Sequence, residues 1–405
     1  MLQSLETELN DINVFKAALR ERFISHLQSL GLQIKDGGFG GQQNIDKDII
    51  RKQHASQRED RLFKSEQFLI SNVPRLLRYF ANGDEVCPEK ISPIMQRVYS
   101  NTWQAGLFRL ASLTWSVPVS SGFGRRIRYL VWDQNNGKLI GLIAIGDPVF
   151  NLTVRDNLIG WDAQDRKSRL VNIMDAYVLG AVPPYNSLLG GKLVASLLRS
   201  RDIYDDFKNI YGSTEGVISK QVKSARLIAV TTSSSMGRSS VYNRLKLEGK
   251  EYLQPIGYTR GWGHFHIPDS LFNDFREYLR LIGHRYADHY EFGQGPNWRL
   301  RTISAALTSL GFEHKALRHG IKRQVFICKL ADNAFDVLRT GECEPDTASL
   351  LKSEIIGDLA RDRWMIPRAE RRPEFRFWKT EQLLELLGST GSKIKAHNNS
   401  SLFSA

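Results

Sequence analysis

The chain has 405 residues, and at about 150 residues per domain this length predicts two or three domains. Hydrophobic residues make up 41% and charged residues 24%, which is typical of globular proteins and excludes a largely disordered chain. The net charge of +13 favours a polyanionic partner, nucleic acid before a membrane surface, although a basic enzyme or assembly subunit could carry the same charge.

Cysteine usage and the N-terminal sequence indicate the compartment. The three cysteines, Cys87, Cys328 and Cys343, lie far apart, and no CxxC pair occurs. This excludes a zinc ribbon and argues against a disulfide framework. The first residues are acidic and helix-like, unlike a signal peptide. The longest apolar runs, such as residues 139–145, have the length of a strand rather than of a membrane span. We therefore predict a cytoplasmic protein.

Residues 1–118 are predicted to be a helical N-terminal region. A helix is expected over residues 1–34, because apolar side chains recur there at spacings of three and four, and glycines in residues 37–41 end it. A second, densely charged helical stretch begins near Asn44, and Pro74 should kink or divide it. Short helical pieces interrupted by prolines complete the region.

Residues 119–290 are predicted to form an α/β core. Strands at residues 128–132 and 139–145 should pair as an antiparallel hairpin, since Asn136-Gly137 between them is a strong turn signal. The second of these strands is expected to be buried on both faces. The later elements are predicted as strands at 176–182, 227–232 and 258–267, and as helices at 166–174, 192–200, 202–222, 239–247 and 272–281.

Residues 291–388 are predicted to be a mixed basic region, followed by a disordered tail at residues 389–405. Helices are expected over 298–310 and 346–360, around a strand at 323–330. In the stretch that follows, basic and aromatic side chains interleave, which suits contact with a nucleic-acid backbone and its bases, or an interface between proteins. A solvated, partly packed surface is the alternative. The candidates are Arg363, Trp364, Arg371, Arg372, Arg376 and Trp378.

The order of elements in the core resembles the fold of the GCN-related N-acetyltransferases. In that family, loop amides at a helix N-terminus bind the pyrophosphate of acetyl-CoA. The corresponding loop here spans residues 182–192, and the first family glycine falls on Gly190. However, Lys192 stands where a small residue is expected, and the leading Gln or Arg is missing. The resemblance therefore implies an acetyltransferase-like topology with a degenerate cofactor loop, and acetyl-CoA is not favoured as a cofactor.

Three segments of the core also resemble the DruA family of the Druantia anti-phage defence system of bacteria. They read GRRIRYLV at 124–131, RDNLIGWD at 155–162 and DAYVLGAVPPYN at 175–186. The resemblance implies membership of a multi-gene antiviral system that also encodes a large helicase-like protein. It implies no established reaction.

The segment from Arg155 to Lys192 is rich in side chains and glycines that could recognise a ligand. These candidates are Arg155, Asp156, Trp161, Asp175, Tyr185, Asn186, Gly190, Gly191 and Lys192. Arginine can hold phosphate, aspartate can act as a base and tryptophan can stack on a nucleobase. The alternatives are structural: an Arg155–Asp156 pair beside a packed indole, a capping role for Asp175, and a tight turn at the two glycines.

A polar loop at residues 231–240 offers a further candidate. It follows a predicted strand and precedes a predicted helix, so its hydroxyl groups and Arg238 could bind phosphate at the helix N-terminus. Ser239 could instead serve only as a helix cap.

Metal sites and nucleotide-binding motifs are not indicated. His264 and His266 alternate along one predicted strand, and His284 and His289 lie five residues apart, but neither pair has cysteines nearby. We predict no metal. The sequence has neither a P-loop nor a serine nucleophile elbow, so energy from ATP, if the system uses it, must come from a partner.

Together these patterns predict an α+β protein that serves as a subunit of an antiviral defence system and binds nucleic acid or a helicase-like partner. The alternative is an acyl-CoA-dependent transferase that modifies a phage or host component. A third possibility, a nuclease, would require carboxylates to converge. The candidates are Asp147, Asp156, Asp162 and Asp175. The sequence does not assign catalytic residues.

Overall fold

The protein forms two compact units in a computed structural model. One unit comprises Met1–Asp60 and Arg260–Ile321, and the other comprises Arg61–Thr259 and Lys322–Ala405. The structure describes residues 2–32, 34–35, 38–39, 46–215, 222–223, 225–261, 263–288, 298–313 and 316–402. No helix within these ranges is long and apolar enough to cross a membrane.

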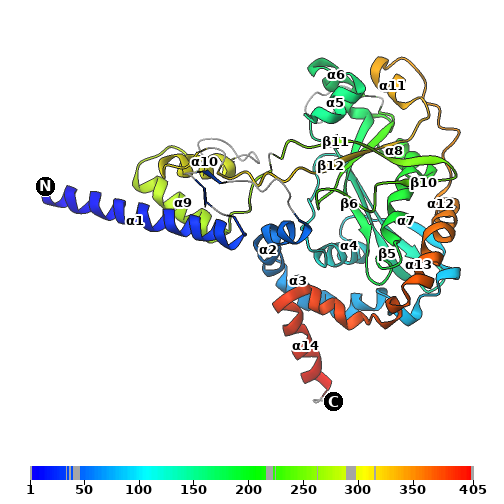
Figure 1. Ribbon diagram of the computed structural model, residues 1–405, viewed down its shortest axis with the longest axis horizontal. Helices are drawn as coiled ribbons and strands as arrows, with labels where there is room; N and C mark the ends of the chain where they lie inside the picture. Colours follow the sequence, from blue (N-terminus) through cyan, green and yellow to red (C-terminus); the bar gives the residue numbers. More distant parts are fainter. Residues whose placement is uncertain are drawn as a thin grey trace. The chain divides into compact units, whose positions relative to one another are not determined.

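The second unit is built on an eight-stranded mixed sheet, which makes the protein α+β (Figure 1). The spatial order of the strands is β10-β11-β12-β9-β6-β5-β4-β3. Neighbouring strands are antiparallel except β6 and β9, which run parallel. The bounds are β3 (Pro93–Arg97), β4 (Arg126–Asp133), β5 (Lys138–Gly146), β6 (Ile173–Ala181), β9 (Ala229–Ser233), β10 (Leu245–Leu247), β11 (Lys250–Tyr258) and β12 (Gln324–Lys329).

The hairpin predicted around Asn136-Gly137 is confirmed as β4 and β5. Gly137 has a φ of 68°, the left-handed conformation that such turns require. Residues 139–145 of β5 are buried, as predicted for a strand covered on both faces. Because side chains alternate along a strand, Ile143 and Ile145 join one hydrophobic core and Leu142 and Ala144 join the other.

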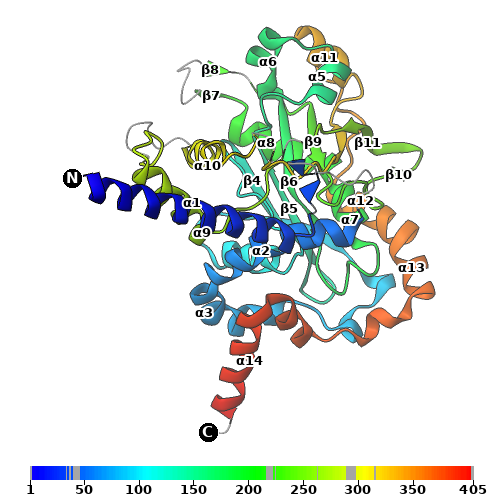
Figure 2. The same cartoon turned by 60° about the vertical axis from the view of Figure 1, so that its left-hand side comes forward.

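Helices cover both faces of this sheet (Figures 1 and 2). The core that contains Ile143 is closed by α7 (Gly190–Ser196), α8 (Arg201–Tyr211) and α12 (Ser353–Ala360). The core that contains Leu142 is closed by α3 (Glu66–Leu76), α4 (Trp103–Leu113) and the 3₁₀ helix Thr380–Leu387. A smaller core is formed by α5 (Thr153–Ile159) and α11 (Ala334–Thr340), and α6 (Ala163–Arg169) follows α5 along the chain.

The first unit is helical and joins two distant parts of the sequence. The described helices are α1 (Leu2–Ser29), most of α2 (Lys47–Phe63), α9 (Asp269–Leu281) and α10 (Trp298–Ser309). Phe23 of α1 is fully buried and contacts the rings of Phe275 and Phe312 at centroid distances of 5.9 and 4.9 Å. The apolar stripe that predicted the first helix is therefore the surface that packs against the later segment.

Several expectations differ from the structure. The helix predicted at 202–222 ends at Tyr211, and the helix predicted at 346–360 begins at Ser353. Strand β11 occupies Lys250–Tyr258, ahead of the strand predicted at 258–267, and Pro255 and Gly257 flank an irregularity in its pairing with β12. The helix predicted at 239–247 is a turn followed by β10. The tail expected to be disordered from residue 389 is helix α14 (Gly388–Leu402), in which Ile394 is buried against the second unit's core.

Candidate nucleic-acid interface

Arg155 and Asp156 form a buried ion pair at the start of α5. The Nε of Arg155 donates to Oδ1 of Asp156 at 2.8 Å, and its Nη1 and Nη2 donate to the carbonyls of Val149 and Phe150 at 3.0 and 2.9 Å. The other oxygen of Asp156 accepts the amide of Leu152 at 3.1 Å. Burial lowers the pKa of Arg155, and the adjacent carboxylate opposes this effect. The pair thus fixes the loop that enters α5.

Trp161 and Asp162 also have partners inside the protein. The indole of Trp161 is 6% exposed and donates to the carbonyl of Leu338 at 2.7 Å. Asp162 caps α6 by accepting the amides of Gln164 and Asp165 at 2.7 and 2.8 Å, and these bonds lower its pKa. Both side chains hold α5, α6 and α11 together.

Asp175 lies where β6 and β9 stop pairing. Their parallel register runs from Ile173 and Ala229 to Asp175 and Thr231. The hydroxyl of Thr231 donates to Oδ1 of Asp175 at 2.8 Å. Burial raises the pKa of Asp175 to about 6, against the opposing effects of this hydrogen bond and of Arg155. The carboxyl group therefore titrates close to neutral pH.

Each of the four carboxylates of the nuclease possibility has a partner within the protein, and Arg155 acts on both Asp156 and Asp175. Asp147 pairs with Arg125 at 2.8 Å, while Asp156, Asp162 and Asp175 make the contacts given above. Within the described ranges, no group of three or more His, Cys, Asp or Glu residues is placed to hold a metal ion. The geometry gives no support for a metal-dependent nuclease centre in this part of the chain.

In the loop after β6, the side chain of Tyr185 is buried, and most backbone amides donate hydrogen bonds to carbonyls of the same loop. Tyr185 is fully buried, and its hydroxyl donates to Oδ2 of Asp133 at 2.9 Å. The amides of Asn186, Ser187 and Leu188 donate to carbonyls of residues 182, 184 and 185 at 3.0, 3.0 and 3.1 Å. The amides of residues 190 and 192 likewise donate to the carbonyls of residues 185 and 189, each at 2.8 Å. These amides are therefore occupied by the protein itself.

Lys192 brings this loop together with the basic C-terminal stretch. Its ammonium lies 5.2 Å from the ring centroid of Trp364, in a π-helical turn at Arg361–Met365. Burial lowers the pKa of Lys192, and the nearby charges of Arg363 and Arg244 lower it further. Arg368, on α13 (Ile366–Arg371), donates to the carbonyl of Ser187 at 3.2 Å. We refer to Lys192, Arg244, Arg363 and Arg368 as the basic surface.

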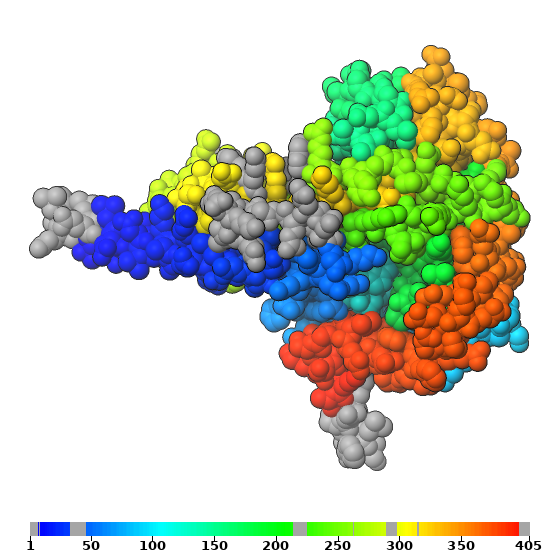
Figure 3. Space-filling model, viewed as in Figure 1, coloured from blue at the N-terminus to red at the C-terminus, as the bar shows by residue number. Residues whose placement is uncertain are grey.

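In the space-filling view, the orange C-terminal segment adjoins the green core segments (Figure 3). Asn186 is exposed at the same loop, whereas Gly190 and Gly191 form the start of α7. Two segments that were predicted separately, at 182–192 and 361–379, therefore meet at the basic surface.

The remaining candidates of the C-terminal stretch are divided between surface and core. Arg371 is exposed, and Arg372 forms an ion pair with Glu374. Arg376 lies 5.8 Å from the ring of its neighbour Phe375. Trp378 is half-buried against the core of α3 and α4, and its indole N–H is buried without a hydrogen-bond partner among the described residues.

Arg238 is exposed in the turn after β9. The following residue, Ser239, accepts the amide of Tyr242 at 3.0 Å, and its own amide donates to Oε1 of Gln324 at 3.2 Å. No helix begins here, so the helix N-terminus expected to hold phosphate is not formed.

The histidines expected on one strand have different surroundings. His266 Nε2 lies 2.7 Å from Oδ2 of Asp60, and His264 bridges to Arg318 through the backbone. His284 is half-buried and its Nδ1 accepts the amide of Tyr286 at 3.1 Å, and His289 lies outside the described residues. The described histidines do not assemble a metal site.

The sequence analysis missed two parts of this unit. Arg244 comes from a turn and has a φ of 61°, and no sequence signal placed it near Lys192. A pocket beside β3 is lined by Tyr79, Trp103 and Trp132, which come from three separate elements. The presence of these three aromatic residues in a basic chain was the available signal for a binding site. Their spacing in the sequence, however, does not indicate that they contact one another.

The fold and these contacts define an α+β protein whose mixed sheet carries a basic surface built from its core and its C-terminal segment. The DruA family model, described as Druantia protein DruA, matches residues 44–340. Druantia protein DruA of Escherichia coli (strain UMEA 4076-1) is 61% identical over 384 residues, which cover 95% of each chain. No solved structure matches the chain. The chain therefore belongs to the DruA family, as the sequence resemblance predicted. DruA is a component of the Druantia anti-phage defence system.

Proposed function

We propose that this chain is a nucleic-acid-binding subunit of its Druantia system and that the basic surface contacts phosphates. The observation that carries the proposal is the position of Lys192, whose pKa is lowered by burial and by the charges of Arg363 and Arg244. Holding like charges together costs free energy, and the attraction of a bound polyanion for each of these cations would offset that repulsion. Lysine and arginine side chains are the usual partners of phosphates in such contacts.

The surroundings of these cations support the same proposal. Some arginines elsewhere in the unit are neutralised locally; Arg361, for example, pairs with Asp358 and Asp362 at 2.7 and 2.8 Å. Arg244 and Arg363 are exposed and form no ion pair with a described carboxylate. The charge of Arg368 is partly compensated, because it interacts with the carboxylate of Glu374 and helps to lower the pKa of that group. No described carboxylate thus forms an ion pair with Lys192, Arg244 or Arg363.

The test is the salt dependence of DNA binding, measured by fluorescence anisotropy at several salt concentrations. Reversing two contacts in the variant Arg244→Glu/Arg363→Glu should weaken binding and reduce the slope of log K against log salt by about 2, because each phosphate contact contributes about 0.9. Lys208→Glu/Lys250→Glu makes the same change in net charge at exposed positions outside this surface and should retain more of the affinity. Equal affinity and slope for the two double variants would overturn the proposal.

Membership of the family also supports other Druantia subunits as partners. We propose that a helicase-like protein is among them, as the sequence resemblance implies. The chain has no P-loop, so any ATP-driven step must take place on such a partner. Co-purification of the chain with the other subunits of its own system, with and without nuclease treatment, tests whether the association depends on nucleic acid.

The core topology supports an acetyltransferase-like origin without acyl-CoA chemistry. A parallel pair, β6 and β9, lies within an otherwise antiparallel sheet, and its pairing ends at Asp175 and Thr231. Beyond that point the hydroxyl of Tyr242 donates to the carbonyl of Leu179 at 2.8 Å, so a protein side chain occupies a backbone acceptor on β6. The amides of residues 186, 187, 188, 190 and 192 in the loop after β6 are occupied as well. We therefore propose that this chain alone does not bind acetyl-CoA, and tight one-to-one binding in calorimetry would overturn this proposal.

A further inference from the structure

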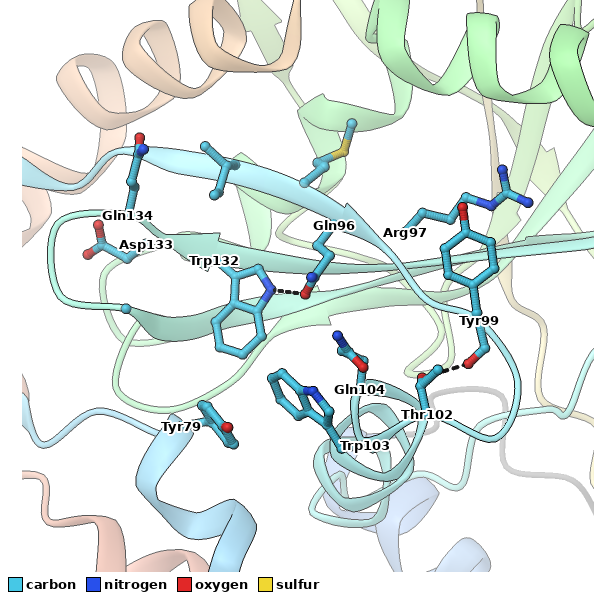
Figure 4. Close-up of a pocket in the computed structure, with 13 residues that line it drawn as sticks. Tyr79, Gln96, Arg97, Tyr99, Thr102, Trp103, Gln104, Trp132, Asp133 and Gln134 are labelled. Atoms are coloured by element: carbon cyan, nitrogen blue, oxygen red, sulfur yellow. Dashed lines mark hydrogen bonds between the residues drawn. The ribbon is translucent and has the colours of Figure 1, made fainter.

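A pocket of about 810 Å³ lies beside edge strand β3 in the second unit (Figure 4). This volume is within the range of pockets that hold small organic ligands. Its walls come from β3, the start of α4, the end of β4 and the 3₁₀ turn Leu77–Tyr79. Neither the family description nor the basic surface accounts for it.

Three aromatic rings form one wall of the pocket. Tyr79 and Trp103 are stacked, with ring centroids 4.6 Å apart and an angle of 17° between the planes. Trp132 meets Tyr79 edge-on at 5.7 Å, and its centroid lies 6.2 Å from that of Trp103. Trp103 is nevertheless 40% exposed. An indole that stacks on another ring and is also partly exposed can provide a surface on which a planar ligand stacks.

The side-chain amides of Gln96 and Gln104 are among the polar groups of the pocket. Oε1 of Gln96 accepts the indole N–H of Trp132 at 2.9 Å, which fixes the side chain and directs its NH₂ group elsewhere (Figure 4). The side chain of Gln104 lies near Gln96 and Trp103 (Figure 4). Each glutamine amide carries both donors and an acceptor, which matches the mixed pattern on the edge of a nucleobase.

The accessible formal charge of the pocket is positive. Arg97 lies over the ring of Tyr99 at 4.7 Å, and Tyr99 is 57% exposed. The carboxylate among the lining residues, Asp133, is fully buried, accepts the amide of Ser92 and the hydroxyl of Tyr185, and has a pKa raised by burial. A ligand that combines a flat ring with a negative charge fits these surroundings better than a cationic or purely apolar side chain.

We infer that this pocket binds an unstacked nucleobase of a single-stranded nucleic acid. Trp103 provides the stacking surface, Gln96 and Gln104 contact the edge of the base, and Arg97 contacts a neighbouring phosphate. The inference rests on the proposed nucleic-acid function and extends it, because the basic surface alone would not distinguish single strands from duplexes.

The experiment compares three DNA probes: a single strand with a central 2-aminopurine, the same strand with an abasic site at that position, and the corresponding duplex. For the wild-type chain, we expect quenching of 2-aminopurine and tighter binding of the intact strand than of the abasic strand. Trp103→Ala should abolish the quenching and weaken binding of the intact strand about 10-fold, with little change for the duplex. Gln104→Ala should weaken the intact strand but not the abasic one.

Tyr258→Ala removes an aromatic side chain of similar exposure outside the pocket, and we expect it to behave as wild type. If both pocket variants keep the quenching and the affinity of wild type while duplex binding persists, the inference about the pocket is wrong and the proposed function is unaffected. Equal loss of single-strand and duplex binding in Trp103→Ala would show an effect on the fold rather than on base contact, which also overturns the inference. A wild-type chain that binds none of the three probes would overturn the proposed function itself.

Discussion

The guanidinium group of Arg155 is fully buried, and this burial explains why the neighbouring carboxylate is needed to stabilise its charge. Moving a charge out of water is costly unless it is paired and hydrogen-bonded. Asp156 provides the opposite charge, and two backbone carbonyls accept the remaining N–H groups. Asn186 has the opposite setting, since its side chain is exposed at the loop beside the basic surface. The two residues therefore give different tests of function and stability.

We expect Asp156→Asn to lower stability and phage protection together. Without the Asp156 carboxylate, Arg155 remains buried and loses its ion-pair partner, and removing one partner of a buried pair costs about 3–5 kcal/mol. Asn186→Ala should change stability by less than about 0.5 kcal/mol, as for other exposed positions. Urea denaturation and phage plating measure the two effects. A stable Asp156→Asn protein without protection would instead indicate a direct role for this carboxylate.

Asp175 should make stability depend on pH in a predictable direction. The folded protein holds this proton up to about pH 6, whereas an unfolded aspartate releases it near pH 4. Between these values the folded state binds more protons, so stability falls as pH rises. Asp175→Asn removes this titration, and its stability relative to wild type should increase by up to about 3 kcal/mol from pH 4 to pH 7. A difference that does not vary with pH would contradict the burial argument.

At the scale of the element, α7 begins with two glycines that have different surroundings. A Cβ added at Gly190 would lie 2.6 Å from the carbonyl oxygen of Tyr185, which accepts the amide of Gly190 itself. A Cβ at Gly191 would meet only a methyl group of Val241, at 3.4 Å. The first glycine is therefore required by a close approach of the backbone, and the second is not.

Gly190→Ala should destabilise the protein by about 1–3 kcal/mol, the usual cost of forcing atoms into a well-packed site. Gly191→Ala should be neutral or slightly stabilising, because alanine has the higher helix propensity. Thermal denaturation of the pair provides its own control. Equal losses of stability in the two variants would show that the turn tolerates no side chain at either position.

Sequence patterns predicted the elements whose signals are local. The β4–β5 hairpin has a turn dipeptide and a continuous apolar strand, and helices α1, α9 and α10 have an apolar periodicity. Strand β3 was missed because it starts with a proline at the edge of the sheet, a position where proline is tolerated but gives no strand signal. Strand β11 was predicted too far along the chain, because Pro255 and Gly257 within it are residues that weaken a strand signal.

The candidate site was predictable only in part, for a related reason. The loop at 182–192 and the stretch at 361–379 each stood out by composition, but their contact through Lys192 and Trp364 depends on tertiary packing. The functional interpretation of Trp161 and Tyr185 stays a prediction, and their buried hydrogen bonds favour the structural alternative. The rings of Tyr79, Trp103 and Trp132 meet because three elements pack on one face of the sheet, which their sequence positions do not reveal.

At the scale of the whole molecule, the helical unit depends on a core shared between two distant segments. Phe23→Ala removes a fully buried ring that contacts Phe275 and Phe312, and large-to-small changes of this kind cost about 3–5 kcal/mol. We expect proteolysis of this variant to begin within residues 260–321, while the unit that contains the sheet keeps its unfolding midpoint. Simultaneous loss of both units would show that they unfold as one.

The shared core also has a consequence for synthesis. The apolar side chains of α1, including Phe23 and Leu27, leave the ribosome about 240 residues before Leu271 and the rest of α9, which cover them in the finished protein. At a translation rate of about 5–20 residues per second, this interval lasts on the order of 12–50 s. During that time the nascent helix exposes an apolar stripe that has no native partner. We therefore expect the growing chain to be a substrate for ribosome-associated chaperones.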